Sequence, residues 1–401
     1  MNLLNKSILE HIIFFPVLWT FTGMFLYSNG KKMMVVFVLI SAIVSFYLYG
    51  KSNFINNTKN IKLIWLLGAC LLFAAFAKVH YGYSSSLLRG LACLFIFFIA
   101  LPPFLSKKIE LKQLTIIGAI STLIYMIVQV FILNNGRMWS INPIPYATFS
   151  ASISALTFYY LLQCKSVKSS LLWLSSFLAA IIPLLYSQSR GLWLALAVVL
   201  LVMIVRLFMT NKKSIYFIFP LMIVSSLAFV LSGNKIVERI EKTKVEIEKI
   251  NEGDLTSSIG LRFQMWKAAI ILIPESPIIG LGKTNIDYKR KLSEQGVISK
   301  GTVNYTHYHN QFLNELVKYG IIGLILLLAS ISYPFYYLNK NNNNNTWPGI
   351  IVISIFILAS LTDVPFQHAQ TITFYFIFLY LALEQKNARQ PSIELKKTLD
   401  T

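Results

Sequence analysis

Two histidines lie two residues apart just before a long apolar run, in the stretch NYTHYHNQFLNELVKYGIIG (residues 304–323). His307 and His309 are two of the five histidines in the chain. Histidine suits abstraction of a proton from a hydroxyl group, because its ordinary pKa of about 6.5 is close to neutral pH. A histidine at the end of a membrane span is more often structural, so the neighbouring residues must decide its role. If the segment is helical, the two side chains point about 200° apart, and only one can face a substrate.

Two arginines are candidates for binding an anionic group. Arg190, in YSQSRGLWLALAVVL, lies between two apolar runs, and Arg262 lies in a polar segment further along the chain. A guanidinium group is permanently charged and binds two phosphate oxygens at once, so both residues suit a diphosphate. A lone arginine near the membrane binds a ligand, pairs with an acid or extends to the interface. Arg137 and Arg89 are weaker candidates, since each could simply anchor the end of a span.

Metal ligands are not evident in the sequence. Asp363, in SLTDVPFQHAQT, is the one carboxylate expected at a span end on the same face as the histidines. The chain has no Asp-x-Asp pair and no two histidines four residues apart. We therefore expect a metal-independent reaction without a cofactor. The three cysteines, at positions 70, 93 and 164, lie in or beside apolar runs and are interpreted as small hydrophobic residues.

The elements that must position these residues are membrane helices. The 401-residue chain is 56% hydrophobic and 13% charged, about half the charged fraction of a soluble protein. Its apolar runs have the length that crosses a bilayer as a helix. The first run lacks a signal-peptide cleavage site and is expected to be retained. The sequence predicts an all-α polytopic membrane protein with about twelve spans, near residues 11–28, 33–50, 62–78, 86–104, 112–134, 146–163, 170–187, 190–208, 214–232, 311–338, 347–363 and 368–384.

Lysine and arginine clusters orient these spans. They fall between alternate spans at residues 51–62, 107–112, 165–168 and 206–213 and in the C-terminal tail, which predicts that both termini are cytoplasmic. The pair Lys31–Lys32 falls on the opposite side and departs from this rule. The net charge is +20, but the basic residues do not form the pattern of a nucleic-acid-binding module. The predicted organisation is nine spans (1–232), a periplasmic loop subdomain (233–310), and three spans with a cytoplasmic tail (311–401).

The loop subdomain is expected to contain two helices. Residues 235–251 alternate isoleucines with charges and predict a solvated helix with i,i+4 pairs Lys242–Glu246 and Lys244–Glu248. Ser257 or Ser258 can cap a second helix, on which Arg262 and Trp266 share a face and which ends at Pro274. The following Gly280-Leu-Gly282 predicts a turn and, more weakly, an anion nest.

The stretch HNQFLNELVKYGIIG resembles the histidine motif of the O-antigen ligases: histidine, then Asn, Ser or Gln, nine residues, glycine, two residues, glycine. Here these are His309, Asn310, Gly320 and Gly323. The order of elements along the whole chain also agrees, and the specific motifs lie within 186–323. The resemblance implies a GT-C-like fold in the inner membrane of a Gram-negative bacterium, with the active site facing the periplasm.

By this resemblance, the protein transfers O-antigen glycan from undecaprenyl diphosphate to a sugar of the lipid A–core, with inversion and without metal. His309 would be the general base, Arg190 and Arg262 the diphosphate ligands, and His307 the alternative base. Its partners would be these two glycolipids and membrane lipids, and no nucleic acid. An O-antigen polymerase of the same superfamily is the nearest alternative. A transporter is less favoured, since no inverted repeat is evident.

Overall fold

The computed structural model describes residues 3–389 except positions 109, 136–138, 211–217 and 341–345. Every regular element in these ranges is a helix, which confirms the all-α prediction. The helices are α1 (Leu3–Phe21), α2 (Gly23–Leu26), α3 (Gly30–Asn60), α4 (Lys62–His80), α5 (Ser85–Ala100), α6 (Pro103–Lys107), α7 (Leu111–Ile127), α8 (Pro143–Leu161), α9 (Val167–Tyr186), α10 (Arg190–Thr210), α11 (Ile218–Asn251), α12 (Ser258–Leu272), α13 (Asn285–Glu294), α14 (Lys300–Val303), α15 (Gln311–Asn339), α16 (Trp347–Ser360) and α17 (Ala369–Arg389).

Seven helical segments of the described chain are long and apolar enough to cross a membrane, at residues 6–26, 30–60, 62–80, 111–132, 167–186, 190–210 and 311–339. Shorter apolar helices lie at 85–100, 347–360 and 369–384. The protein is therefore a multi-pass helical membrane protein. Each of the twelve predicted spans overlaps a helix, but only these seven meet the length and hydropathy of a span by themselves. The count of twelve stays a prediction.

Helix α8 lies at the centre of the bundle, in contact with α7, α9, α10 and α16. It is buried along nearly its whole length and carries serine and threonine at positions 148, 150, 152, 154 and 157. Ser150 donates a hydrogen bond of 2.6 Å to the Ala180 carbonyl of α9. Small polar side chains that bond to backbone allow helices to approach closely in an apolar surrounding.

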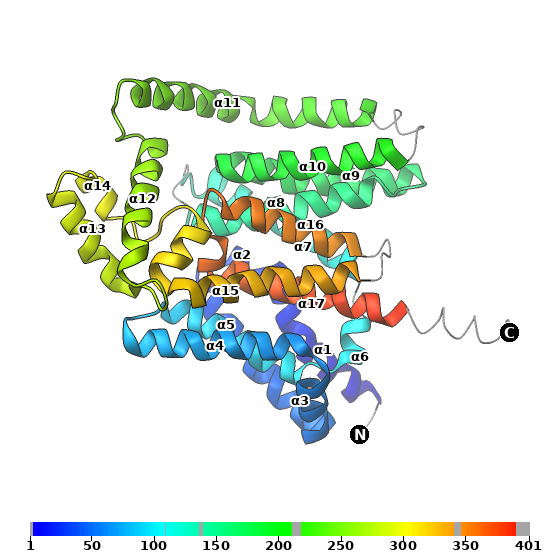
Figure 1. Ribbon diagram of the computed structural model, residues 1–401. Helices are drawn as coiled ribbons and strands as arrows, with labels where there is room; N and C mark the ends of the chain where they lie inside the picture. The colour runs from blue at the N-terminus through cyan, green and yellow to red at the C-terminus, as the bar shows by residue number, and fades with distance from the viewer. Residues whose placement is uncertain (1–2, 109, 136–138, 211–217, 341–345, 390–401) are drawn as a thin grey trace.

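The predicted loop subdomain gathers at one end of the bundle, the left in Figure 1, whereas α17 ends on the other side. Its own small core includes Met265, Leu272, Leu292 and Tyr308. The Ser257 hydroxyl accepts a hydrogen bond from the Gly260 amide, which confirms the predicted cap of α12. Segment 273–275 turns away as a short 3-10 helix, so the helix ends next to Pro274 as predicted.

Helix α11 differs from the prediction in two respects. It runs without a break from Ile218 to Asn251, so the predicted boundary between residues 232 and 233 falls inside a helix. The expected Lys242–Glu246 and Lys244–Glu248 pairs are replaced by Lys242–Glu238 and Lys244–Glu241. The Lys242–Glu246 pair is absent because the Glu246 carboxylate binds a partner outside α11, described below.

Helix α15 is interrupted at Gly320, whose backbone angles are φ 61° and ψ −160°. The segment 277–280 fills the break: the Ile321 amide donates to Pro277 and the Ile322 amide to Ile278. A Cβ atom on Gly320 would lie 2.3 Å from the Ile278 backbone. Glycine is therefore required there by both backbone angle and space. The predicted Gly280 turn is the segment that packs against this break.

Candidate active site

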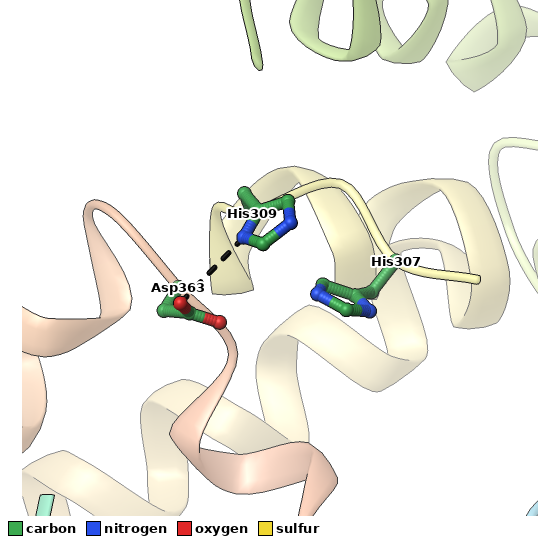
Figure 2. A group of neighbouring side chains, drawn as sticks. All are labelled: His307, His309 and Asp363. Atoms are coloured by element: carbon green, nitrogen blue, oxygen red, sulfur yellow. Dashed lines mark ion pairs between the residues drawn. The ribbon is translucent and has the colours of Figure 1, made fainter. Parts of the chain in front are cut away.

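His309 and Asp363 form the centre of the candidate site (Figure 2). His309 Nδ1 lies 3.5 Å from Asp363 Oδ2, and the two side chains are 15% and 3% exposed. This distance suits an ion pair, but Nδ1 makes no hydrogen bond among the described residues. A buried carboxylate beside an imidazole orients the ring and stabilises its protonated form. Asp363 was a supporting candidate from sequence, and the structure brings it to His309.

His307 joins the same site. The two imidazole rings have centroids 4.3 Å apart, and Figure 2 shows both beside Asp363. The predicted divergence of 200° does not apply, because residues 304–310 lie between α14 and α15 and are not helical. In such a stretch alternate side chains share a side, so His307 and His309 face the site while Tyr308 points into the small core. Tyr308 is fully buried, and its hydroxyl bonds to Asn285 at 3.0 Å.

Three neighbours hold this histidine segment in place. Trp266 Nε1 donates a 3.0 Å hydrogen bond to the Tyr308 carbonyl, and Lys289 donates to the Tyr305 carbonyl. Asn310 caps α15 through the Leu313 amide and also donates to the Leu361 carbonyl at 3.3 Å. The predicted supporting residues Trp266 and Asn310 therefore fix the backbone around His309, whose φ is 45°. A positive φ is unusual for a residue with a side chain.

Asp363 is placed by the turn that follows α16. Its Oδ1 atom accepts a hydrogen bond from the Val364 amide. Gly191, next to Arg190, allows this turn to lie against α10, since a Cβ atom there would lie 2.1 Å from Thr362 Oγ1. The small residue in the SRG motif thus has a packing role that brings α10 to the site.

The electrostatics favour a charged carboxylate and a neutral His307. Burial alone would raise the pKa of Asp363, but His309, His307 and Arg262 outweigh it and hold that pKa below its usual range. Burial lowers the pKa of His307 to about 3, and the nearby His309 adds to the shift. His307 is therefore neutral at physiological pH, whereas Asp363 is ionised.

Arg262 provides a positive charge beside this pair. Burial lowers the pKa of its guanidinium group, and Asp363 acts in the opposite direction. Arginine nevertheless stays protonated in proteins. Arg262 forms no ion pair or hydrogen bond within the described residues. It thus has donors available for an anion.

The Arg190 guanidinium is already paired with side chains of α11. Its guanidinium donates to both carboxylate oxygens of Glu246, at 3.1 and 2.9 Å, and to Thr243 Oγ1 at 2.7 Å. Both charged side chains are less than one-fifth exposed. The charges of Arg190 and Glu246 also act on the pKa of the Arg262 guanidinium, Arg190 lowering it and Glu246 raising it. The sequence-based interpretation of α11 as merely solvated missed this pair. An anionic ligand at Arg190 must displace or share it.

The predicted supporting residue Arg89 is not brought to the histidines. Arg89 lies on α5 and lines a different cavity. Arg137 lies outside the described residues. The structure instead reveals a grouping that the sequence did not: one ligand atom each from His307, His309 and Asp363 lie within 4.8 Å of one another. Two imidazoles and a carboxylate are a donor set that zinc uses, so metal independence requires an experimental test.

A buried His–Asp pair next to a free arginine can remove a proton from a hydroxyl group beside a bound anion. Fold and site together define a multi-pass helical membrane protein with the elements of a group-transfer enzyme. Residues 174–328 match the family described as O-antigen ligase. This match supports the resemblance over that part of the chain. The matched range contains Arg190, Arg262 and both histidines.

A Haemophilus influenzae protein described as uncharacterized is 32% identical to this chain over 206 residues. The similarity covers 50% of this chain and 51% of that protein. The chain thus matches about half the length of this relative.

Proposed function

We propose that the protein is an O-antigen ligase that transfers a glycan from undecaprenyl diphosphate to a sugar hydroxyl of the lipid A–core. The observation that carries this proposal is the His309–Asp363 pair, which lies beside the unpaired Arg262. His309 and Arg262 are within the family-matched segment. A transfer to a hydroxyl group needs a base, and a diphosphate leaving group needs positive charge.

In the proposed reaction His309 accepts the proton of the acceptor hydroxyl through the nitrogen that does not face Asp363. The hydroxyl oxygen attacks the anomeric carbon of the donor glycan from the side opposite the diphosphate. The bond between that carbon and the diphosphate oxygen breaks, the configuration inverts, and undecaprenyl diphosphate leaves. Asp363 stabilises the imidazolium that forms, and Arg262 neutralises charge on the leaving group.

Arg190 is the second diphosphate ligand in this proposal. Because Glu246 and Thr243 occupy it, the diphosphate would replace the carboxylate of Glu246. That exchange conserves charge pairing at Arg190. The site would face the periplasm of a Gram-negative inner membrane, where a polyprenyl tail lies in lipid and its diphosphate at the interface.

The test is deletion of the protein in a strain that makes O-antigen. We expect long O-antigen polymer to accumulate on the lipid carrier while lipid A–core stays without it. Accumulation of single repeat units on the carrier would instead identify a polymerase, the alternative within the same superfamily. Unchanged lipopolysaccharide would contradict both functions.

An assay with purified protein tests whether the reaction needs a metal ion. We expect ligation to continue in excess chelator, because the proposed base and the arginines need no ion. Loss of ligation in chelator that zinc restores would instead assign His307, His309 and Asp363 to a catalytic metal site.

A further inference from the structure

A second cationic cavity, only about 10 Å³ in volume, lies among the starts of three helices. It is lined by Met24, Lys31, Met34, Ser86, Arg89, Gly90, Cys93, Ala369 and Thr373. Lys31 and Arg89 form no ion pair or hydrogen bond within the described residues, and no carboxylate lines the cavity. Arg89 is exposed and Lys31 is half-buried, so both cations reach the opening of the cavity, where an anionic ligand can neutralise them.

The helix ends increase that charge. Lys31 is the second residue of α3, Ser86 the second of α5, and Ala369 the first of α17. Helix N-termini carry partial positive charge and unpaired amide groups. A lysine in the first turn is therefore unfavourable unless an anion lies nearby. Lys31 also departs from the charge rule that orients the spans.

A buried hydroxyl group lines the same cavity. Thr373 is only 2% exposed, yet its side chain forms no hydrogen bond within the described residues. Buried hydroxyl groups are normally hydrogen-bonded, because an unpaired one is costly. Thr373 therefore offers a donor to a ligand in the cavity.

The cavity is next to the candidate active site. His368 immediately precedes Ala369 of the cavity, and both Asp363 and Lys31 influence the His368 imidazole electrostatically. An enzyme that joins two lipid-anchored substrates has to hold two lipid head groups within reach of one base. Arg262 and Arg190 would serve one of them.

We propose that Lys31, Arg89 and Thr373 bind, at the opening of this cavity, a lipid-borne phosphate group, that of the glycolipid acceptor. This inference rests on the proposed function, in which the acceptor is a phosphorylated lipid A–core. The helix starts and the two cations hold the phosphate at the interface, and the acceptor sugar extends to His309. Binding here positions the acceptor and takes no part in the proton transfer.

The direct test measures binding without turnover. The full-length His309→Ala protein is placed in nanodiscs of zwitterionic lipid and titrated with labelled lipid A carrying its phosphates, or with the same lipid dephosphorylated. We expect the Lys31→Gln/Arg89→Gln double substitution to weaken binding of the phosphorylated lipid about tenfold or more, since two charge-assisted contacts are lost. Binding of the dephosphorylated lipid should be weak and unchanged. Lys32→Gln, an exposed neighbour that does not line the cavity, is the matched control and should bind normally.

Equal binding of phosphorylated lipid by the double variant and its control would overturn the proposal. An equal loss for both lipids would also overturn it, because the charges would then act on the fold. Competition by phosphatidylglycerol as strong as that by phosphorylated lipid A would overturn the assignment to the acceptor in favour of bulk phospholipid. Thermal unfolding of each variant checks that the protein is intact.

Ligation kinetics distinguish a failure of the proposed phosphate site from a failure of the proposed ligase function. With the native histidine, the double variant should raise the KM for the acceptor about tenfold and leave kcat and the KM for the donor unchanged. If the protein ligates no glycan while the binding pattern holds, the proposed function fails and the phosphate site stands. If it ligates and the double variant binds acceptor normally, the phosphate site fails alone.

Discussion

At the residue scale, His309 is defined by what surrounds it. Asp363 lies 3.5 Å away and is almost fully buried, so its charge acts on the imidazole with little screening by water. His307 is held neutral by burial and therefore does not compete for that carboxylate as an ion pair. This asymmetry favours His309 as the base, although both rings share one site.

The role of Asp363 can be separated from folding by Asp363→Asn. The amide keeps the shape but cannot stabilise a protonated imidazole, so kcat for ligation should fall about tenfold to a thousandfold. The KM for the donor and the melting temperature should stay near their native values. Asp363→Glu should restore part of kcat. A donor KM that rises as kcat falls would show that Asp363 binds donor or supports the fold instead.

The Arg190–Glu246 pair makes a second residue-scale prediction. Glu246→Gln removes the carboxylate that competes with a diphosphate for Arg190, and we expect the donor KM to fall several-fold with kcat little changed. Glu241→Gln is the matched control on α11, because Glu241 pairs only with the exposed Lys244. A donor KM raised by Glu246→Gln would mean that the carboxylate orients Arg190 for the donor.

At the scale of elements, the sequence predicted the features that depend on residues close together in the chain. The cap at Ser257 and the end of α12 follow from side-chain chemistry within a few residues. Gly320 was named as a motif residue, but its packing against segment 277–280 was not predicted. Asp363 was named as a candidate, whereas its contact with His309 depends on how α16 meets α15. Such contacts between distant segments have no local signal.

The break in α15 gives an element-scale prediction. Gly320→Ala should lower the melting temperature strongly and reduce ligation, since the new methyl group meets the Ile278 backbone and shifts the start of α15, which directly follows the His309 segment. Gly50→Ala is the matched control: Gly50 breaks α3 at φ 62° with nothing within 4 Å of its Cβ position. Gly50→Ala should lose only the stability that corresponds to the backbone strain, roughly 1–2 kcal/mol. Equal losses from both substitutions would contradict a packing role.

At the scale of the whole molecule, the loop subdomain and the basic clusters define two ends of one bundle. Helices α12–α14 gather at one end, whereas α17 runs to the other (Figure 1). Composition and hydropathy could predict this polarity, because lipid imposes apolar helices and asymmetric charge. Helix α8 shows what hydropathy does not detect: its neighbours bury it, and such a helix does not need the apolar surface of an exposed span.

Cysteine labelling tests this polarity. In a background without Cys70, Cys93 and Cys164, a cysteine at Asn251 should react with a membrane-impermeant thiol reagent in intact spheroplasts, because that end is predicted to be periplasmic. A cysteine at Lys165, between α8 and α9, should react only after lysis. The reverse pattern would place His309 on the cytoplasmic side and contradict the proposed reaction.

The most direct measurement of the central claim is ligation by purified His309→Ala and His307→Ala at matched protein amounts, with donor binding measured separately. His309→Ala should lower turnover about 10²–10⁴-fold, the usual contribution of a general base, while donor binding survives. His307→Ala should be milder, because His307 makes no contact with the Asp363 carboxylate within ion-pair range. Normal ligation by His309→Ala together with an inactive His307→Ala would show that His307 is the base. Normal ligation by both variants would contradict a histidine base altogether.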